Sequence, residues 1–102
     1  MKAIPERSEA ELQQKIIDLC TELRFKVFHS GDARRDTGRG FPDLVIATTH
    51  GKLIFAELKS YTGDMSPHQS SWKWALKASG ADWRLWRPHD WPAIESELRM
   101  IT

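Results

Sequence analysis

Two short apolar segments on either side of a tight turn constrain the fold of this chain more than any other feature. They are "PDLVIATT", residues 42–49, and "KLIFAELKS", residues 52–60, and each has the length and apolar content of a β-strand. Only His50 and Gly51 separate them. Strands joined by so short a connection pair in opposite directions. The segment therefore predicts an antiparallel hairpin, and the rest of the chain should extend and cover the sheet that this hairpin begins.

The remainder of the chain supplies the other elements of an α/β domain. Apolar residues at helical spacing predict helices at residues 8–24, where Ser8 is the expected N-cap, from Ser66–Pro67 to about Ser79, and at residues 91–100. Two more strands are expected at residues 25–30 and 82–87. The predicted order is α-β-β-β-α-β-α, a mixed sheet flanked by helices. Because 102 residues suffice for one hydrophobic core but not two, we expect a single domain, residues 1–102.

Composition excludes several classes of protein. Hydrophobic residues make up 40% of the chain, yet no run of 18 apolar residues occurs, so no segment is expected to span a membrane. The first residues become polar too soon for a secretory signal, which predicts a cytoplasmic protein. The single cysteine, Cys20, allows no disulfide within the chain and no multi-cysteine zinc site. Its position in an apolar helix stripe predicts a buried, unreactive thiol.

Charged residues interrupt the hairpin at positions where a core strand would have valine or isoleucine. If the turn is centred near His50, paired residues have numbers that sum to about 100, and Asp43 lies opposite Glu57. Glu57 and Lys59 point to one face because side chains alternate along a strand. Two facing carboxylates repel each other unless a proton or a cation lies between them. The pattern is typical of a Mg²⁺ site for phosphodiester hydrolysis, although an ion-pair network at a solvated end of the sheet is an alternative.

These residues form a pattern that resembles a known family. "GFPD", thirteen intervening residues and "ELK" are similar to the signature of the PD-(D/E)XK nucleases. The resemblance narrows to the VRR-NUC group, in the small stand-alone form found in bacteriophages and related mobile elements. It extends over nearly the whole chain and rests on six segments: "SEAELQ", "FKVFH", "GFPDL", "FAELKS", "SPHQSSW" and "LWRPHDW". It implies a restriction-endonuclease-like fold and a metal-dependent DNA endonuclease in a bacterial or phage-infected cell.

The resemblance also implies roles for individual residues. Asp43, Glu57 and the main-chain carbonyl of Leu58 would bind Mg²⁺, which Mn²⁺ should be able to replace. Lys59 would assist the attacking water. A glutamate on the first helix often completes such a site, and related nucleases often have a glutamine where this chain has Gln69.

Helical periodicity distinguishes two candidates for the helix glutamate. Glu9 lies three residues before Leu12 and seven before Ile16, so it extends the stripe expected to face the sheet. Glu11 instead shares a charged stripe with Lys15, where the two form an ordinary pair four residues apart. We therefore predict a site role for Glu9, with a favourable interaction with the helix dipole as the alternative.

Gln69 and the basic residues each have two interpretations. "SPHQ" is a capping box in which Ser66 caps the helix and Gln69 reaches back, but the amide can equally face the metal site. His29 can contact a phosphate or be structural. Solvated surface is the alternative for the residues predicted to bind DNA, which are Arg34, Arg35, Arg39, Lys73 and Lys77.

The sequence thus predicts an endonuclease that acts on branched or structured DNA, with Holliday-junction resolution as the leading specific function. A homodimer is expected, because resolving a four-way junction requires two symmetric cuts. Three alternatives stay open: a non-catalytic DNA-binding module on the same fold, a structural protein with an ion-pair network, and a monomeric nicking or flap nuclease.

Overall fold

The computed structural model of the chain describes residues 5–31 and 36–101. Within them, three α-helices and four β-strands follow one another in the order α, β, β, β, α, β, α, with two short 3-10 helices between. Their bounds are α1 Pro5–Glu22, β1 Lys26–His29, η2 Asp36–Gly38, β2 Leu44–Ala47, β3 Leu53–Leu58, α2 Pro67–Ala78, β4 Asp82–Trp86, η3 Pro88–Asp90 and α3 Trp91–Met100.

The four strands form one mixed sheet in the order β1-β2-β3-β4. The first two neighbouring pairs are antiparallel, and β3 and β4 are parallel. In the β2–β3 hairpin, Leu44 pairs with Ala56 and Ala47 pairs with Leu53, so the predicted register is confirmed. The hairpin turns through Thr49 and Gly51, whose φ angles are 65° and 89°. The α/β class with a mixed sheet flanked by helices is therefore also confirmed.

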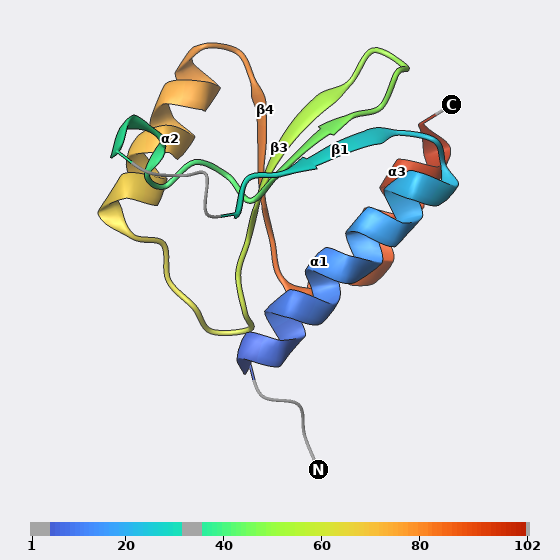
Figure 1. Cartoon of the computed structure of the whole chain (residues 1–102), viewed down its shortest axis with the longest axis horizontal. Helices are drawn as coiled ribbons and strands as arrows, with labels where there is room; N and C mark the ends of the chain where they lie inside the picture. The colour runs from blue at the N-terminus through green and yellow to red at the C-terminus, as the bar shows by residue number, and fades with distance from the viewer. Residues whose placement is uncertain (1–4, 32–35, 102) are drawn as a thin grey trace.

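The helices cover the two faces of the sheet unequally. Figure 1 shows α1 and α3 side by side on one side of the sheet and α2 on the other. The hydrophobic core lies on the α1 and α3 side, where alternate residues of β2 and β3 are buried against both helices. The buried members are Leu12, Ile16, Leu19, Cys20, Phe25, Leu44, Ile46, Ile54, Ala56, Leu58, Trp86, Ile94 and Leu98.

The first helix begins and ends earlier than the sequence predicts. It begins at Pro5, three residues before the predicted cap Ser8, because the fixed φ of proline suits the first helical position. It ends at Glu22, since Arg24 adopts a left-handed conformation with φ 66°. The N–H of Phe25 then donates to the Cys20 carbonyl at 2.8 Å, and that of Arg24 to Thr21, which completes a Schellman cap without glycine.

Cys20 is fully buried in the core, as predicted, and desolvation raises the pKa of its thiol to about 11. Among the described residues, no helix has the length and apolar character needed to cross a membrane.

The third layer, α2, packs on the sheet through aromatic rings. Phe41 contacts Trp72 edge-to-face with ring centroids 5.0 Å apart, and it contacts Phe55 of β3 in the same way at 6.0 Å. No residue of α2 is fully buried, so this side of the sheet is covered by half-buried side chains only. Phe41 lies two residues before Asp43, and the aromatic contacts therefore hold both the start of β2 and the helix in place.

Candidate functional site

Asp43 lies immediately before β2 and is held there from both sides. Its main-chain carbonyl accepts from the Ser30 N–H at 3.0 Å, and Ser30 Oγ donates to the Pro42 carbonyl, also at 3.0 Å. On the other side, Asp43 Oδ2 accepts from the Leu58 N–H at 2.8 Å. Asp43 as a whole is 8% exposed. Extending the hairpin register by one residue places Asp43 opposite Glu57, as the sequence predicts.

Glu57 and Lys59 lie at the carboxyl end of β3. Glu57 is only 1% exposed, although it lies on the sheet face that α2 covers rather than in the main core. Lys59 Nζ is 3.9 Å from Glu57 Oε2, and the Lys59 side chain is 15% exposed. The Lys59 N–H donates to the Trp86 carbonyl at 3.0 Å, which fixes the end of β3 against β4. The carboxylates and the lysine therefore lie at one end of the sheet.

Gln69 closes the predicted capping box and also contacts Glu57 on the sheet. Its Oε1 accepts from the Ser66 N–H at 2.8 Å, and Ser66 Oγ accepts from the Gln69 N–H at 3.2 Å, which completes the capping box of α2. Its Nε2 donates to Glu57 Oε2 at 2.8 Å. One amide thus connects the first turn of α2 to the carboxylate of β3.

A close backbone approach sets the position of α2 relative to the acidic residues. Gly40 has φ 85°, and a Cβ atom there would lie 2.4 Å from the carbonyl carbon of His68 and 2.7 Å from the Gln69 nitrogen. Only glycine allows the chain before Asp43 to pass so close to the first turn of α2. This contact holds Gln69 within reach of Glu57.

Of the two glutamates of α1, Glu9 is the more buried, as the helical periodicity predicts. Glu9 is partly buried and Glu11 is exposed. Within residues 5–31 and 36–101, however, no group of three or more histidine, cysteine, aspartate or glutamate side chains comes close enough to hold a metal ion. In this structure Glu9 thus does not join Asp43 and Glu57 in a set of three carboxylates.

The predicted DNA-binding residues have different surroundings. His29 and Arg39 are exposed. At the end of β1, His29 pairs with Leu44, the residue that follows Asp43. Lys73 lies over the Trp83 ring at 5.1 Å, and Lys77 lines a surface pocket on α2 with Lys73 and Trp74. Arg34 and Arg35 lie outside the described residues.

Sequence reasoning missed Arg87, which holds the chain that follows Lys59. Its Nη1 donates to the carbonyls of Ser60 at 2.8 Å and Gly63 at 2.9 Å. More than twenty residues separate the donor from these acceptors, so no local pattern predicts the contact. The only signal is the position of Arg87 directly after β4, the strand that pairs with β3.

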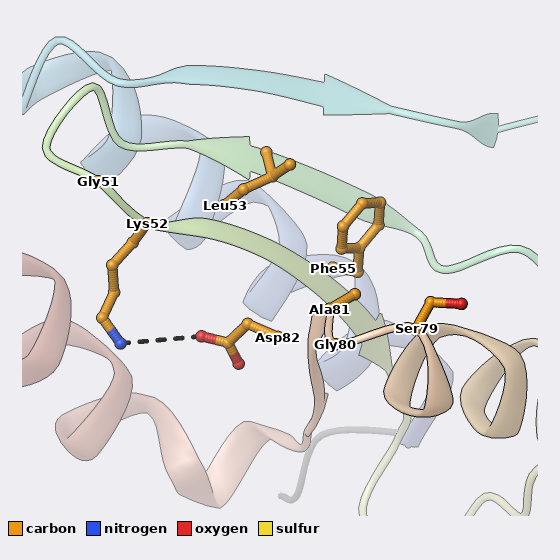
Figure 2. Close-up of a pocket in the computed structure, with 8 residues that line it drawn as sticks. All are labelled: Gly51, Lys52, Leu53, Phe55, Ser79, Gly80, Ala81 and Asp82. Carbon is orange, nitrogen blue, oxygen red and sulfur yellow. Dashed lines mark ion pairs between the residues drawn. The ribbon is translucent and has the colours of Figure 1, made fainter.

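A separate cavity lies at the other end of the sheet, where β3 and β4 begin (Figure 2). It is lined by the hairpin residues Gly51, Lys52, Leu53 and Phe55 and by Ser79, Gly80, Ala81 and Asp82. Its charged pair is Lys52 and Asp82, with Nζ 3.8 Å from Oδ2. No predicted site residue lines this cavity, so the acidic residues, not this hollow, are the candidate active site.

Comparisons with family models, with curated proteins and with solved structures gave no match.

Proposed function

We propose that this protein is a metal-dependent DNA endonuclease that hydrolyses phosphodiester bonds. The observation that carries the proposal is the position of Asp43, Glu57 and Lys59 at one end of the sheet, with Glu57 1% exposed. Burying a carboxylate costs free energy, and a second carboxylate on the neighbouring strand increases that cost. A divalent cation bound between the two carboxylates would offset both the cost of burial and the repulsion.

The donor atoms suit magnesium. Asp43 and Glu57 offer carboxylate oxygens, and the main-chain carbonyl of Leu58 is the third ligand that we assign; all are hard oxygen donors of the kind that Mg²⁺ prefers. When bound, the ion would polarise the scissile phosphate and supply an acidified water. Mn²⁺ should replace it, because the ligands are the same.

The neighbouring side chains have supporting roles. Lys59 presents its positive charge beside Glu57, where it would position the attacking water and stabilise negative charge that develops on the phosphate oxygens. Gln69 donates to one oxygen of Glu57 and would orient the carboxylate towards the metal. Glu9, partly buried on α1, would contribute when metal and DNA are bound.

We assign the chain to the VRR-NUC group of the PD-(D/E)XK nucleases, with a restriction-endonuclease-like fold. Its motifs and the mixed sheet with helices on both faces support this assignment. We further propose that it acts as a homodimer in the cytoplasm of a bacterial or phage-infected cell, on branched or structured DNA such as a Holliday junction. Lys73 and Lys77 on α2, together with His29, Arg34, Arg35 and Arg39, would bind the DNA backbone.

A cleavage assay tests the proposal. End-labelled four-way junctions, flaps, nicked duplexes and plain duplex are incubated at equal concentration with Mg²⁺ or with EDTA. The wild type should cut a branched substrate only with Mg²⁺. Asp43→Asn and Glu57→Gln should abolish cutting, because each removes a charged metal ligand, while Lys59→Ala should lose turnover. Cutting at the wild-type rate by either carboxylate variant would refute the proposal.

The two glutamates of α1 provide an internal comparison. Glu9→Gln should slow single-turnover cleavage about tenfold, because Glu9 is partly buried and lies one helical turn before the buried Leu12. Glu11→Gln changes one exposed charge on the same helix and should be nearly neutral. The opposite ranking would assign the helix glutamate to Glu11.

A further inference from the structure

Two short segments leave the sheet side by side next to the candidate active site. Strands β3 and β4 are parallel and end together, with Leu58 paired to Trp86. Residues 60–63 follow Lys59, and residues 87–90 follow Trp86. Since the ends of the two strands coincide, both segments begin at the end of the sheet that carries Glu57 and Lys59.

Arg87 ties the two segments together. Besides donating to the Ser60 and Gly63 carbonyls, its Nη1 is 3.5 Å from the Tyr61 carbonyl, and its own N–H donates to Asp90 Oδ2 at 2.8 Å. Several hydrogen bonds from a charged group restrict the backbone of Tyr61 more than a neutral turn would. The segment that carries Tyr61 is therefore held in one position.

The rings of Tyr61 and His89 stack on each other across the two segments. Their centroids are 5.9 Å apart and their planes are inclined by 22°. Tyr61 is nevertheless 50% exposed, and the side chain of His89 is 58% exposed. About half of each residue is therefore accessible to a ligand, on segments that begin at the end of the sheet where Glu57 and Lys59 lie.

The geometry points to a nucleobase-binding platform, formed by Tyr61 and His89, that receives an unpaired base next to the phosphate to be cut. Aromatic side chains bind bases by stacking without regard to sequence, because every base has a π-face. A base inside a duplex is already stacked on both sides, so only a base at a branch, flap or single-stranded end can occupy the platform. This inference rests on the proposed nuclease function and narrows its substrates: a flap or a single-stranded end offers an unpaired base next to the cutting position, whereas a fully paired four-way junction would first have to open at its branch point.

Fluorescence of 2-aminopurine tests the platform without cleavage. The base analogue is placed at the first unpaired position of a flap, and binding is measured in EDTA; a fully paired nicked duplex of the same sequence is the reference. The variants are Tyr61→Ala, Tyr61→Phe and Tyr61→Leu. Phe28→Ala is the control, because Phe28 is also exposed but lies on β1, at the opposite edge of the sheet from β4.

The wild type, Tyr61→Phe and Phe28→Ala should quench the flap probe. Tyr61→Ala and Tyr61→Leu should lose the quenching and bind the flap about tenfold more weakly, with less than a twofold change for the paired duplex. Leucine keeps apolar bulk without a π-face, so Tyr61→Leu decides the matter if Tyr61→Ala fails to fold. Unchanged quenching and affinity in a folded Tyr61 variant would overturn the platform.

The results also separate this inference from the proposed function. A protein that quenches the probe through Tyr61 but cuts no DNA in Mg²⁺ would refute the nuclease and keep the platform. A protein that cuts flaps, with cutting and binding unaffected in Tyr61→Ala, would refute the platform and keep the nuclease. Absence of DNA binding by the wild type would refute both.

Discussion

Gln69 illustrates how one side chain can close a helix cap and contact a buried carboxylate at once. An amide has an acceptor end and a donor end. In Gln69 the acceptor oxygen closes the capping box with Ser66, and the donor nitrogen contacts Glu57. The capping box was predictable from "SPHQ", but the contact with Glu57 depends on how α2 docks on the sheet. Closing the capping box therefore does not prevent Gln69 from donating to Glu57.

Replacement of Gln69 by glutamate should separate the two roles. Gln69→Glu keeps the oxygen that caps α2 and places a second carboxylate against Glu57. Without metal, the variant should be less stable by about 2 kcal/mol, because a hydrogen bond to a buried charge is replaced by repulsion. Mg²⁺ should raise its melting temperature more than that of the wild type. Differential scanning calorimetry with and without Mg²⁺ measures both effects.

Gln14 offers a control with the same chemistry on the surface. Its Nε2 donates to Asp18 Oδ1 at 2.9 Å on the exposed side of α1. Gln14→Glu should change the melting temperature little, because solvent screens the new repulsion. Equal destabilisation by the two substitutions would mean that the Gln69–Glu57 contact has no special importance.

At the level of elements, α2 is positioned by the passage of Gly40 across its first turn. Gly40→Ala should destabilise the protein and slow cleavage together, because the new Cβ would collide with the His68 carbonyl and displace Gln69 from Glu57. Gly80 has nearly the same φ, 87°, but a Cβ atom there would meet nothing within 4 Å. Gly80→Ala therefore carries only the left-handed strain of about 1–2 kcal/mol.

The stabilities of the two glycine variants can be compared directly. Gly40→Ala should lose at least about 1 kcal/mol more stability than Gly80→Ala in urea unfolding, since overpacking adds to the strain. Cleavage should fall in Gly40→Ala alone. If both variants unfold and cut alike, the close approach at Gly40 does not position the site.

Strand β4 and helix α3 are joined by Arg84, which links two carboxylates. Its guanidinium donates to Asp82 at 2.6 Å and to Glu97 at 2.8 Å. These hydrogen bonds hold the pKa values of both carboxyls below their usual range, against the opposing effect of burial. Because the folded-state pKa values are lowered, the stabilisation is complete above the unfolded values, near pH 4, and is lost as the pH falls through the folded values.

Arg84→Gln should therefore lower the free energy of unfolding by about 1 kcal/mol at pH 7, a figure reduced for partial exposure. The difference from the wild type should shrink as the pH is lowered from about 4 towards 2. Arg99→Gln is the comparison, because Arg99 also bonds two carboxylates, those of Glu22 and Glu95, but on the open surface. Its effect should be smaller at every pH. If the loss of unfolding free energy in Arg84→Gln stayed constant from pH 7 to pH 2, it would not come from the lowered pKa values of Asp82 and Glu97.

The sequence predicts elements well where the determinants are local. The hairpin register follows from apolar alternation and the short turn, and the start of α2 follows from Ser66 and Pro67. The end of α1 was less predictable, because Arg24 takes a left-handed conformation that glycine adopts far more readily than other residues. Arg87 escaped prediction for a different reason, since its acceptors are backbone carbonyls far away in the chain.

At the scale of the whole molecule, the sheet has one well-packed face and one thinly covered face. The main core lies between the sheet and α1 and α3, whereas α2 contributes no fully buried residue. Glu57 is on the α2 side, so the charged residues do not interrupt the main core. We expect local opening of α2 before global unfolding, because its half-buried contacts stabilise it less than burial in the main core would.

A homodimer on DNA has two measurable consequences. Light scattering at micromolar concentration should give about twice the chain mass, and junction cutting should yield paired symmetric nicks.

Replacing Lys73 and Lys77 by glutamine should weaken binding to all DNAs. It should also reduce the slope of affinity against salt concentration by the equivalent of up to about two phosphate contacts. Lys26→Gln, an exposed lysine on β1, should do neither. A monomeric mass both with and without junction DNA would leave a nicking or flap nuclease.

The central claim is that Asp43 and Glu57 hold a divalent cation, and Mn²⁺ titration followed by electron paramagnetic resonance tests it most directly. The signal of free Mn²⁺ reports binding without DNA or turnover. The wild type should remove Mn²⁺ from solution, and Mg²⁺ should compete for the same site. Asp43→Asn and Glu57→Gln should lose this binding, and Lys59→Ala should keep it. Equal Mn²⁺ binding by the wild type and both carboxylate variants would contradict the account.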